Sequence, residues 1–314
     1  MHDNEPPVES LEALDTRLRT IRDWLRYGAS AFNAAKLSFG HGTDNALDEA
    51  LALVLHTLHL GPPELDASWL DARVSAAEAG RIHALFERRI RERIPAAYLT
   101  REAWFAGLRF YVDERVVIPR SPLAELIEAR IEPWLAREPR RILDLCCGSG
   151  CIGIAAALAF PEAEVVLADC DPGALEVAQC NVLEYGLENR LQLAESDLFE
   201  DLDERPFDLV LANPPYVDEP AYAALAQEYR HEPRTGLESG PLGLDHPLRI
   251  LAATADRLTA GGLLVLEVGA TQPALERALP NLDMTWVEFE RGGEGVAVVT
   301  REALIAPDAL EVAA

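Results

Sequence analysis

The tetrapeptide Asn213-Pro214-Pro215-Tyr216 follows the apolar run 207–212, so an amide side chain and two prolines stand where a buried strand should end. Each proline fixes its own φ and lacks an N–H group, and Pro214 favours an extended Asn213. The Asn213 side-chain oxygen and the Pro214 carbonyl are then oriented acceptors for the two donors of a planar NH₂ group. They can stabilise the positive charge that methylation puts on the nitrogen, while the Tyr216 ring lies flat on the group. The tetrapeptide therefore indicates a catalytic site for N-methylation.

A second candidate site is the glycine-rich stretch DLCCGSG, residues 144–150, between an apolar strand pattern and a helix pattern. Gly148 and Gly150 let the backbone approach a bound nucleoside closely. Asp169 ends the next strand, where a carboxylate can accept hydrogen bonds from both ribose hydroxyls. The glycine loop is weak evidence alone, but with Asp169 it predicts a nucleoside ligand.

The details of the loop favour S-adenosylmethionine as that nucleoside. Cys146 stands where a dinucleotide-binding loop has its first glycine, and no lysine follows to hold phosphates. S-adenosylmethionine has a ribose and an adenine but no phosphate. Asp197, after the third strand, can accept from the adenine amino group, although a role as a turn or cap residue is an equal alternative. The predicted cofactor-binding residues are Asp144, Cys146, Gly148, Gly150, Asp169, Asp197 and Asn213.

Strand and helix patterns alternate from residue 123 onward, which predicts a mostly parallel sheet with helices on both faces. A short last connection makes the final strand antiparallel. In open α/β sheets, ligands bind at the carboxyl ends of the strands, so the glycine loop and the tetrapeptide should face one crevice. This context disfavours a plain turn or a polyproline ligand at Pro214-Pro215. The expected strands are 141–146, 164–168, 191–194, 207–212, 263–268, 286–290 and 296–300.

The first hundred residues carry helix patterns instead. Leu11, Leu14, Leu18, Ile21 and Leu25 recur at helical spacing. A second helix should begin after Asp44 or Asn45 and stop at Gly61-Pro62-Pro63, and a third should run from Ser75 to Pro95. Residues 103–118 predict a β-hairpin with Asp113-Glu114 in its middle. The expected domains are a helical substrate-recognition domain at 1–100, a hairpin linker at 101–122 and a catalytic domain at 123–314.

Composition limits the function classes further. The chain has a net charge of −25, divided as −4 over residues 1–100 and −21 over the remainder. A protein that grips nucleic-acid phosphates usually has the opposite balance, and an acidic surface suits a basic partner. The basic run Arg88-Arg89-Ile90-Arg91 with Arg93 is interpreted as a solvated helix face.

Neither a membrane protein nor a disulfide or metal framework is expected. The N-terminus lacks a secretory signal, and the longest apolar run, 152–160, is shorter than the roughly 20 residues that a bilayer requires. These features predict a soluble cytoplasmic protein. The five cysteines lack metal-ligand spacing and are interpreted as small buried thiols in a reducing compartment.

Taken together, these motifs resemble class I S-adenosylmethionine-dependent methyltransferases of the amino-methylating kind. The helical front and VVIPRSPLAELI narrow the resemblance to the HemK-like protein-glutamine methyltransferases, over residues 9 to 306. The stretches DLCCGSGCI and NPPYVDEPAYAALAQEYRHEPRTGLESGPLGLD are similar to the branch that acts on the third protein of the large ribosomal subunit. The resemblance implies a Rossmann-like seven-stranded sheet with an antiparallel last strand, behind a small helical domain and a hairpin.

The resemblance also implies site roles. Gly148, Gly150 and Asp169 bind S-adenosylmethionine, Asn213 and the Pro214 carbonyl hold the glutamine amide, and Tyr216 packs on it. Arg120 and the segment 228–233, with Glu232, are expected on the substrate side, and a structural ion-pair cluster is the alternative for that segment. Other functions left open are a methyltransferase for an exocyclic amino group of adenine or guanine in DNA or RNA, one for the release-factor glutamine, and a non-enzymatic assembly protein.

Overall fold

The computed structural model describes residues 17–61 and 68–312, and the chain divides into two compact units. The first contains Met1–Glu102 together with Ala226–His231, and the second contains Ala103–Leu225 and Glu232–Ala314. Residues 226–231 therefore join the helical unit although they lie far along the chain. Within the described ranges, no helix has the length and apolar character needed to cross a membrane.

Side-chain caps define the helices of the first unit. Asn45 accepts hydrogen bonds from the N–H groups of Leu47 and Asp48, both at 3.0 Å, and Ser75 forms a capping box with Glu78. Asn45 is one of the two caps that the sequence offered for its helix, and Ser75 is the residue at which the third helix was expected to begin. The helices of this unit are α2 (Ile21–Ala34), α3 (Ala46–Leu58), the 3-10 turn η2 (Trp69–Asp71), α4 (Ala76–Arg91) and α5 (Ala96–Thr100).

The first helix starts later than its leucine spacing predicts. Thr20 caps α2 with a side-chain bond to the Asp23 N–H, so Leu18 lies before the helix. Leu11, Leu14 and the Pro62-Pro63 stop lie outside the described residues.

The interpretation of the basic run on α4 as a solvated face is wrong for Arg89. Its side chain is fully buried, and its Nε donates to Glu49 Oε1 at 2.6 Å. Glu228, also buried, accepts from Arg93 Nη1 at 3.1 Å and from the Ser38 N–H at 3.0 Å. A guanidinium can be buried when carboxylates share its fixed fork of donors, and the helical spacing could not reveal these distant partners.

The linker hairpin is shorter than predicted. Strands β1 (Glu102–Phe105) and β2 (Leu108–Tyr111) form a two-stranded sheet that turns at Ala106-Gly107, so Asp113-Glu114 is not the turn. Asp113 instead binds the Arg115 guanidinium and accepts from the Tyr111 hydroxyl at 2.8 Å. The Arg115 side chain holds the pKa of Asp113 down to about 2.

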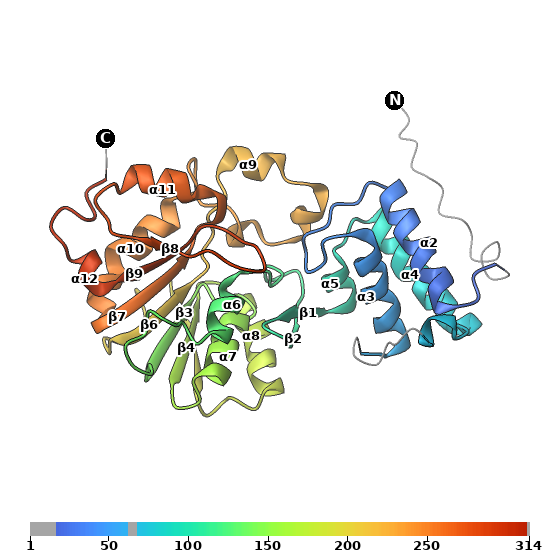
Figure 1. The fold of residues 1–314 in the computed structure, drawn as a ribbon, viewed down its shortest axis with the longest axis horizontal. Helices are drawn as coiled ribbons and strands as arrows, with labels where there is room; N and C mark the ends of the chain where they lie inside the picture. Colours follow the sequence, from blue (N-terminus) through green and yellow to red (C-terminus); the bar gives the residue numbers. More distant parts are fainter. Residues whose placement is uncertain (1–16, 62–67, 313–314) are drawn as a thin grey trace. The chain divides into compact units, whose positions relative to one another are not determined.

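The second unit contains the predicted seven-stranded sheet, in the order β5-β4-β3-β6-β7-β9-β8 (Figure 1). Strands β3 to β7 pair in parallel, and β9 is antiparallel to both of its neighbours, which confirms the expected fold. The strands are β3 (Arg141–Leu145), β4 (Glu164–Asp169), β5 (Leu191–Glu195), β6 (Phe207–Ala212), β7 (Leu258–Glu267), β8 (Thr285–Trp286) and β9 (Val296–Thr300).

Strand β8 stops well before its predicted end at residue 290. The backbone N–H groups of Glu290 and Arg291 donate to the Glu125 carboxylate at 2.9 and 3.1 Å instead of to a neighbouring strand. A side-chain carboxylate thus replaces the backbone hydrogen bonds that a neighbouring strand would make at this edge.

Apolar residues cover both faces of the sheet, as a parallel sheet requires. One face packs against α6, α7 and α8, and the other against α10, α11 and α12 (Figure 1). The helices of this unit are α6 (Leu123–Glu128), α7 (Cys151–Ala159), α8 (Pro172–Glu184), α9 (Glu219–Ala224), α10 (Asp245–Arg257), α11 (Gln272–Ala278) and α12 (Arg301–Leu304).

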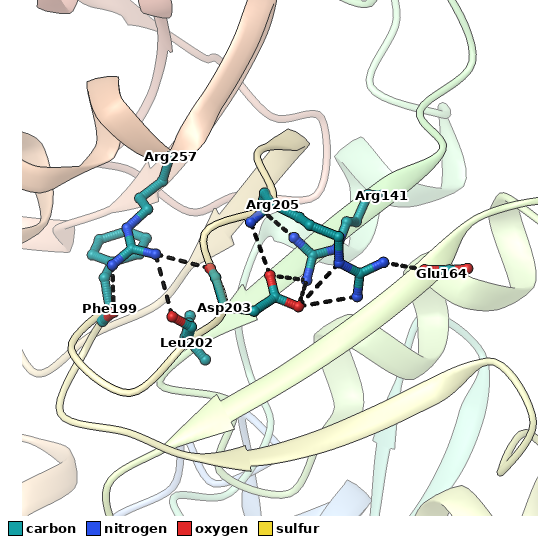
Figure 2. A network of polar contacts seen from close by, with 7 residues as sticks. All are labelled: Arg141, Glu164, Phe199, Leu202, Asp203, Arg205 and Arg257. Atoms are coloured by element: carbon teal, nitrogen blue, oxygen red, sulfur yellow. Dashed lines mark hydrogen bonds and ion pairs between the residues drawn. The ribbon is translucent and has the colours of Figure 1, made fainter.

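An ion-pair network lies at the amino ends of the strands (Figure 2). Arg141, the first residue of β3, lies over the Phe207 ring at 4.1 Å and donates to both carboxylate oxygens of Asp203. Arg205 binds the same carboxylate, and Arg257 donates to the Asp203 carbonyl at 2.9 Å. These bonds hold the segment before β6 at the edge opposite the strands' carboxyl ends.

Candidate functional site

The glycine loop follows β3 and leads into α7. Gly148 has φ +53° and Gly150 has φ +76°, values that favour glycine, and a Cβ on Gly148 would meet nothing within 4 Å. Cys146, half-buried, adopts φ +60° although it has a side chain. The loop therefore leaves open space beside its backbone, as close approach of a ligand requires.

Asp144 lies in β3 beneath this loop and is fully buried. Its Oδ2 accepts from the Gly153 N–H at 2.7 Å, and its Oδ1 has no hydrogen-bond partner among the described residues. Burial raises the pKa of Asp144 to about 8, a shift that the Gly153 bond opposes and the Asp169 charge increases. The site thus holds a buried carboxyl oxygen without a hydrogen-bond partner among the described residues.

Replacing Asp144 with asparagine should reduce the pH dependence of stability. Because the folded pKa is raised, the native state binds more protons than the unfolded state between the ordinary 3.8 and about 8, so wild-type stability falls as pH rises through that window. Each shifted unit corresponds to about 1.4 kcal/mol, and the neutral asparagine has no such cost. Urea unfolding across this window should show the variant losing less stability. Parallel pH curves for the variant and the wild type would contradict the assignment, and the exposed Asp201→Asn serves as control.

Asp169 ends β4 beside the glycine loop. Its Oδ2 accepts from the Gly148 N–H at 2.9 Å and its Oδ1 from the Asp171 N–H at 3.0 Å. Burial raises its pKa, and these backbone bonds oppose the shift. Both oxygens are thereby oriented at the carboxyl end of the sheet, where remaining lone pairs can accept from ribose hydroxyls.

Asp197, the predicted adenine acceptor, lies in an exposed turn after β5. Its Oδ2 accepts from Arg249 Nη2 at 2.9 Å, and Arg249 also binds Glu200 at 3.3 Å. Asp197 is therefore an ion-pair partner in this structure, and its role toward adenine stays a prediction.

The tetrapeptide follows β6, which lies beside β3. Ala212 pairs with Leu145 on β3 and with Leu266 on β7, so Asn213 leaves the sheet next to the glycine loop. Pro214 and Pro215 are buried and Asn213 is half-buried. Within residues 17–61 and 68–312, the Asn213 side chain has no hydrogen-bond partner, so its oxygen can accept from a ligand.

Tyr216 is held from several sides. Its N–H donates to the Leu237 carbonyl at 3.1 Å, and its hydroxyl donates to Glu267 Oε1 at 2.9 Å. A Cβ on Gly269 would lie 2.8 Å from the Tyr216 ring, and one on Gly243 would lie 2.2 Å from the Tyr216 carbonyl. The two glycines therefore leave room for Tyr216 in its observed position.

Arg120 and Glu232, predicted on the substrate side, pair with each other. Arg120 donates to both carboxylate oxygens, at 2.6 and 2.9 Å, and the Ile118 N–H donates to Glu232 at 2.9 Å. This bidentate pair fixes the segment before α6. Glu228 lies in the other unit's ion-pair cluster, which matches the structural alternative for the segment 228–233.

Sequence reasoning missed two side chains that border this site. Glu267 ends β7 and is 5% exposed, and Ser121 donates to its second carboxylate oxygen. The sequence feature that could have revealed Glu267 is an acid near the end of the apolar run 263–268. A carboxylate buried there requires hydrogen-bond donors.

The cysteine prediction is only partly right. Cys147 and Cys151 are buried and Cys146 is half-buried, but Cys170 and Cys180 are exposed. All five thiols are free, and burial raises the pKa of Cys151 to about 12.

These residues fit S-adenosylmethionine. The open space beside Gly148, the unpartnered Asp144 oxygen and the oriented Asp169 carboxylate lie around one loop, which follows the strand at the sheet's reversal of order. The site contains no lysine in the loop to hold phosphates. These acidic groups suit a nucleoside, whose ribose hydroxyls can donate to them, better than a negatively charged nucleotide.

The strand order and the loop define an S-adenosylmethionine-dependent class I methyltransferase, and residues 126–241 match the family model of the methyltransferase small domain. The ribosomal protein uL3 glutamine methyltransferase of Bordetella pertussis is 50% identical, over 91% of this chain and 97% of that protein. The protein of the same name from Xylella fastidiosa is 50% identical, over 95% of this chain and 96% of its own length. The chain belongs to the family of ribosomal protein uL3 glutamine methyltransferases. A methyltransferase structure from Pyrococcus furiosus aligns with 62% of this chain and 89% of its own, at 16% identity and a TM-score of 0.46.

Proposed function

We propose that this protein transfers a methyl group from S-adenosylmethionine to the side-chain amide nitrogen, N5, of a glutamine in ribosomal protein uL3. The observation that carries the proposal is the half-buried Asn213 side chain at the end of β6, beside the glycine loop. The names of relatives that are 50% identical over nearly the whole chain supply the substrate.

The residues around the loop would hold the methyl donor. Gly148 and Gly150 give its backbone close access, Asp169 accepts from the ribose hydroxyls, and Asp144 and Cys146 line the turn. Asp197 would accept a hydrogen bond from the adenine amino group in place of the one that it now accepts from Arg249. When bound, S-adenosylmethionine supplies a methyl group attached to a cationic sulfur. The sulfur keeps the electron pair of the broken bond when the methyl group is transferred.

The tetrapeptide would hold the acceptor. The Asn213 oxygen and the Pro214 carbonyl accept from the two amide N–H groups, and Pro215 rigidifies the backbone that carries them. This arrangement stabilises positive charge as the amide nitrogen is methylated, and the nitrogen gives up one proton to solvent as the product leaves the site. Tyr216 packs on the amide plane and excludes water.

Outside the reacting groups, charge and domain structure support a basic protein substrate. Ribosomal proteins bind RNA phosphates with basic side chains, and this chain has a net charge of −25. We assign substrate recognition to the helical domain, residues 1–100, with Arg120 and Glu232 shaping the substrate side. The site of action is the cytoplasm, where the substrate is free uL3 or an assembling ribosomal particle. We expect neither membrane binding nor sequence-specific binding of nucleic acid.

Labelled S-adenosylmethionine tests the proposal with an extract that contains ribosomal proteins, release factors, DNA and RNA from a strain that lacks the enzyme. We expect label in uL3 alone, and acid hydrolysis of that band should release labelled methylamine, which identifies an amide nitrogen. Label in DNA or RNA would favour the exocyclic-amine alternative, and label in a release factor would favour the other glutamine substrate. Wild-type uL3, already methylated, serves as the negative control.

A further inference from the structure

The carboxylate of Glu267 is the strongest feature of the site that the proposed function leaves without a role. It is the last residue of β7, 5% exposed, and follows Leu266, the strand partner of Ala212. Glu267 and Asn213 therefore leave neighbouring strands at the same level of the sheet. Burying a carboxylate is costly, and an apolar residue of similar size would pack at least as well, so this acid calls for a role in the site.

Both carboxylate oxygens are used. Oε1 accepts from the Tyr216 hydroxyl at 2.9 Å, and Oε2 accepts from the Ser121 hydroxyl. Ser121 itself is 7% exposed, and its oxygen also accepts from the Leu123 N–H at 3.1 Å. Arg120, which is bidentate to Glu232, adds a favourable charge near Glu267, and the two hydroxyls donate to the Glu267 oxygens directly.

The bond to Glu267 fixes the one part of Tyr216 that the backbone does not hold. Leu237 anchors the Tyr216 N–H, and Gly269, with φ +47°, lets the ring edge come close to the loop after β7. Rotation of the side chain about χ1 would carry the hydroxyl away from Glu267, break this bond and leave a buried carboxylate oxygen unsatisfied. The hydroxyl bond thereby fixes the position of the ring before any substrate binds, and the close approach of Gly269 to the ring edge limits rotation of its plane.

Hydrogen bonding to a carboxylate also changes the ring's electrostatics. A phenol that donates to an anion carries more electron density in its ring, and a richer ring face attracts a nearby cation more strongly. In the proposed reaction, positive charge passes to the amide nitrogen. Stabilisation by the ring would thus be larger in the transition state than in the ground state, which raises kcat rather than affinity.

We propose that Glu267 is a positioning residue for methyl transfer, acting through the Tyr216 hydroxyl to orient and enrich the ring that covers the acceptor amide. This inference rests on the proposed function for the identity of the acceptor. Ser121 completes the arrangement by occupying the second carboxylate oxygen, so that Oε1 remains directed at Tyr216.

A double-mutant cycle tests the proposal in the full-length enzyme. Glu267→Gln and Tyr216→Phe should each lower kcat by about 10- to 100-fold, less than the loss of about 100- to 1,000-fold for a group that contacts the reacting atoms directly, because Glu267 acts through the hydroxyl. The Kd for S-adenosylmethionine should change less than about twofold, and the double variant should be no slower than the worse single variant. Glu276→Gln, on the exposed surface of α11, is the matched control and should keep wild-type kcat.

Additive losses in the cycle would overturn the proposal, because Glu267 would then act independently of the hydroxyl. Should Glu267→Gln fail to fold, Tyr216→Phe decides alone, since it removes only the hydroxyl, and a wild-type kcat in that variant overturns the idea. Ser121→Ala keeps the Tyr216 bond and should cost less than either variant.

A second readout separates this inference from the proposed function. In enzyme with ¹³C-labelled tyrosine and no substrate, the Tyr216 Cζ resonance, assigned by its loss in Tyr216→Phe, should shift on Glu267→Gln. An unmoved resonance would refute the hydrogen bond whichever acceptor the enzyme uses. A shifted resonance in an enzyme that leaves uL3 unlabelled would instead retain the bond and reject only the substrate.

Discussion

Asn213→Ala lowers methyl transfer by about 100- to 1,000-fold, the expected loss for removing one oriented polar group that stabilises developing charge. The Asn213 oxygen lacks a partner among the described residues and stands beside the Pro214 carbonyl, so its removal leaves one amide N–H of the substrate without an acceptor. The Kd for S-adenosylmethionine should stay largely intact, because Asp169 and the glycine loop remain. Single-turnover rates and calorimetric titration of the cofactor measure the two quantities separately.

Two further variants sharpen that experiment. Asn281→Ala removes an exposed amide whose weak bond to the Asp308 carbonyl, at 3.5 Å, lies outside the site, and should leave turnover unchanged. Asn213→Asp keeps an acceptor oxygen, so it should retain more activity than Asn213→Ala if acceptance of a hydrogen bond is the role. A biological function that survives Asn213→Ala would favour an assembly role over catalysis.

Asp169→Ala should weaken S-adenosylmethionine binding by about 100-fold or more, since hydrogen bonds to a charged group contribute about 1.5–3 kcal/mol each and two ribose hydroxyls lose their acceptor. The variant also frees the Gly148 and Asp171 N–H groups, which loosens the glycine loop. Calorimetric Kd values, with thermal unfolding measured with and without cofactor, give the result. Unchanged affinity would place the ribose elsewhere.

The control for that measurement is again a surface acid. Asp201 lies in the exposed turn between β5 and β6, so Asp201→Asn should bind the cofactor as the wild type does. Asp169→Asn separates charge from shape, because its amide keeps one acceptor oxygen. We expect an intermediate Kd for it.

Several elements were predictable because their signals are local. Asn45 and Ser75 stand where helices were expected to begin, and each caps its helix, since a cap depends on backbone groups two or three residues away. Strand β6 has the predicted bounds because an apolar run ends at two prolines. The hairpin was misplaced because the aromatic and β-branched pattern continued past the real turn at Ala106-Gly107.

Contacts between distant segments were beyond such reasoning. Arg89 looked solvated because its neighbours are basic, whereas its partner Glu228 stands 139 positions away. Strand β8 ended early because Glu125, far upstream, supplied acceptors to its backbone. A helix or strand pattern contains no information about which remote carboxylate will be its neighbour.

By itself, the sequence determined the order of strands and helices, the glycine loop with Asp169, and the rigid tetrapeptide at Asn213, because glycine, proline and apolar spacing act on backbone within a few residues. Only the tertiary structure decided how the site is held. Tyr216 meets Glu267 across 51 positions, and Glu267 meets Ser121 across 146. Those contacts exist because a parallel sheet brings the carboxyl ends of strands that are remote in sequence to one edge, where a buried carboxylate must find its donors.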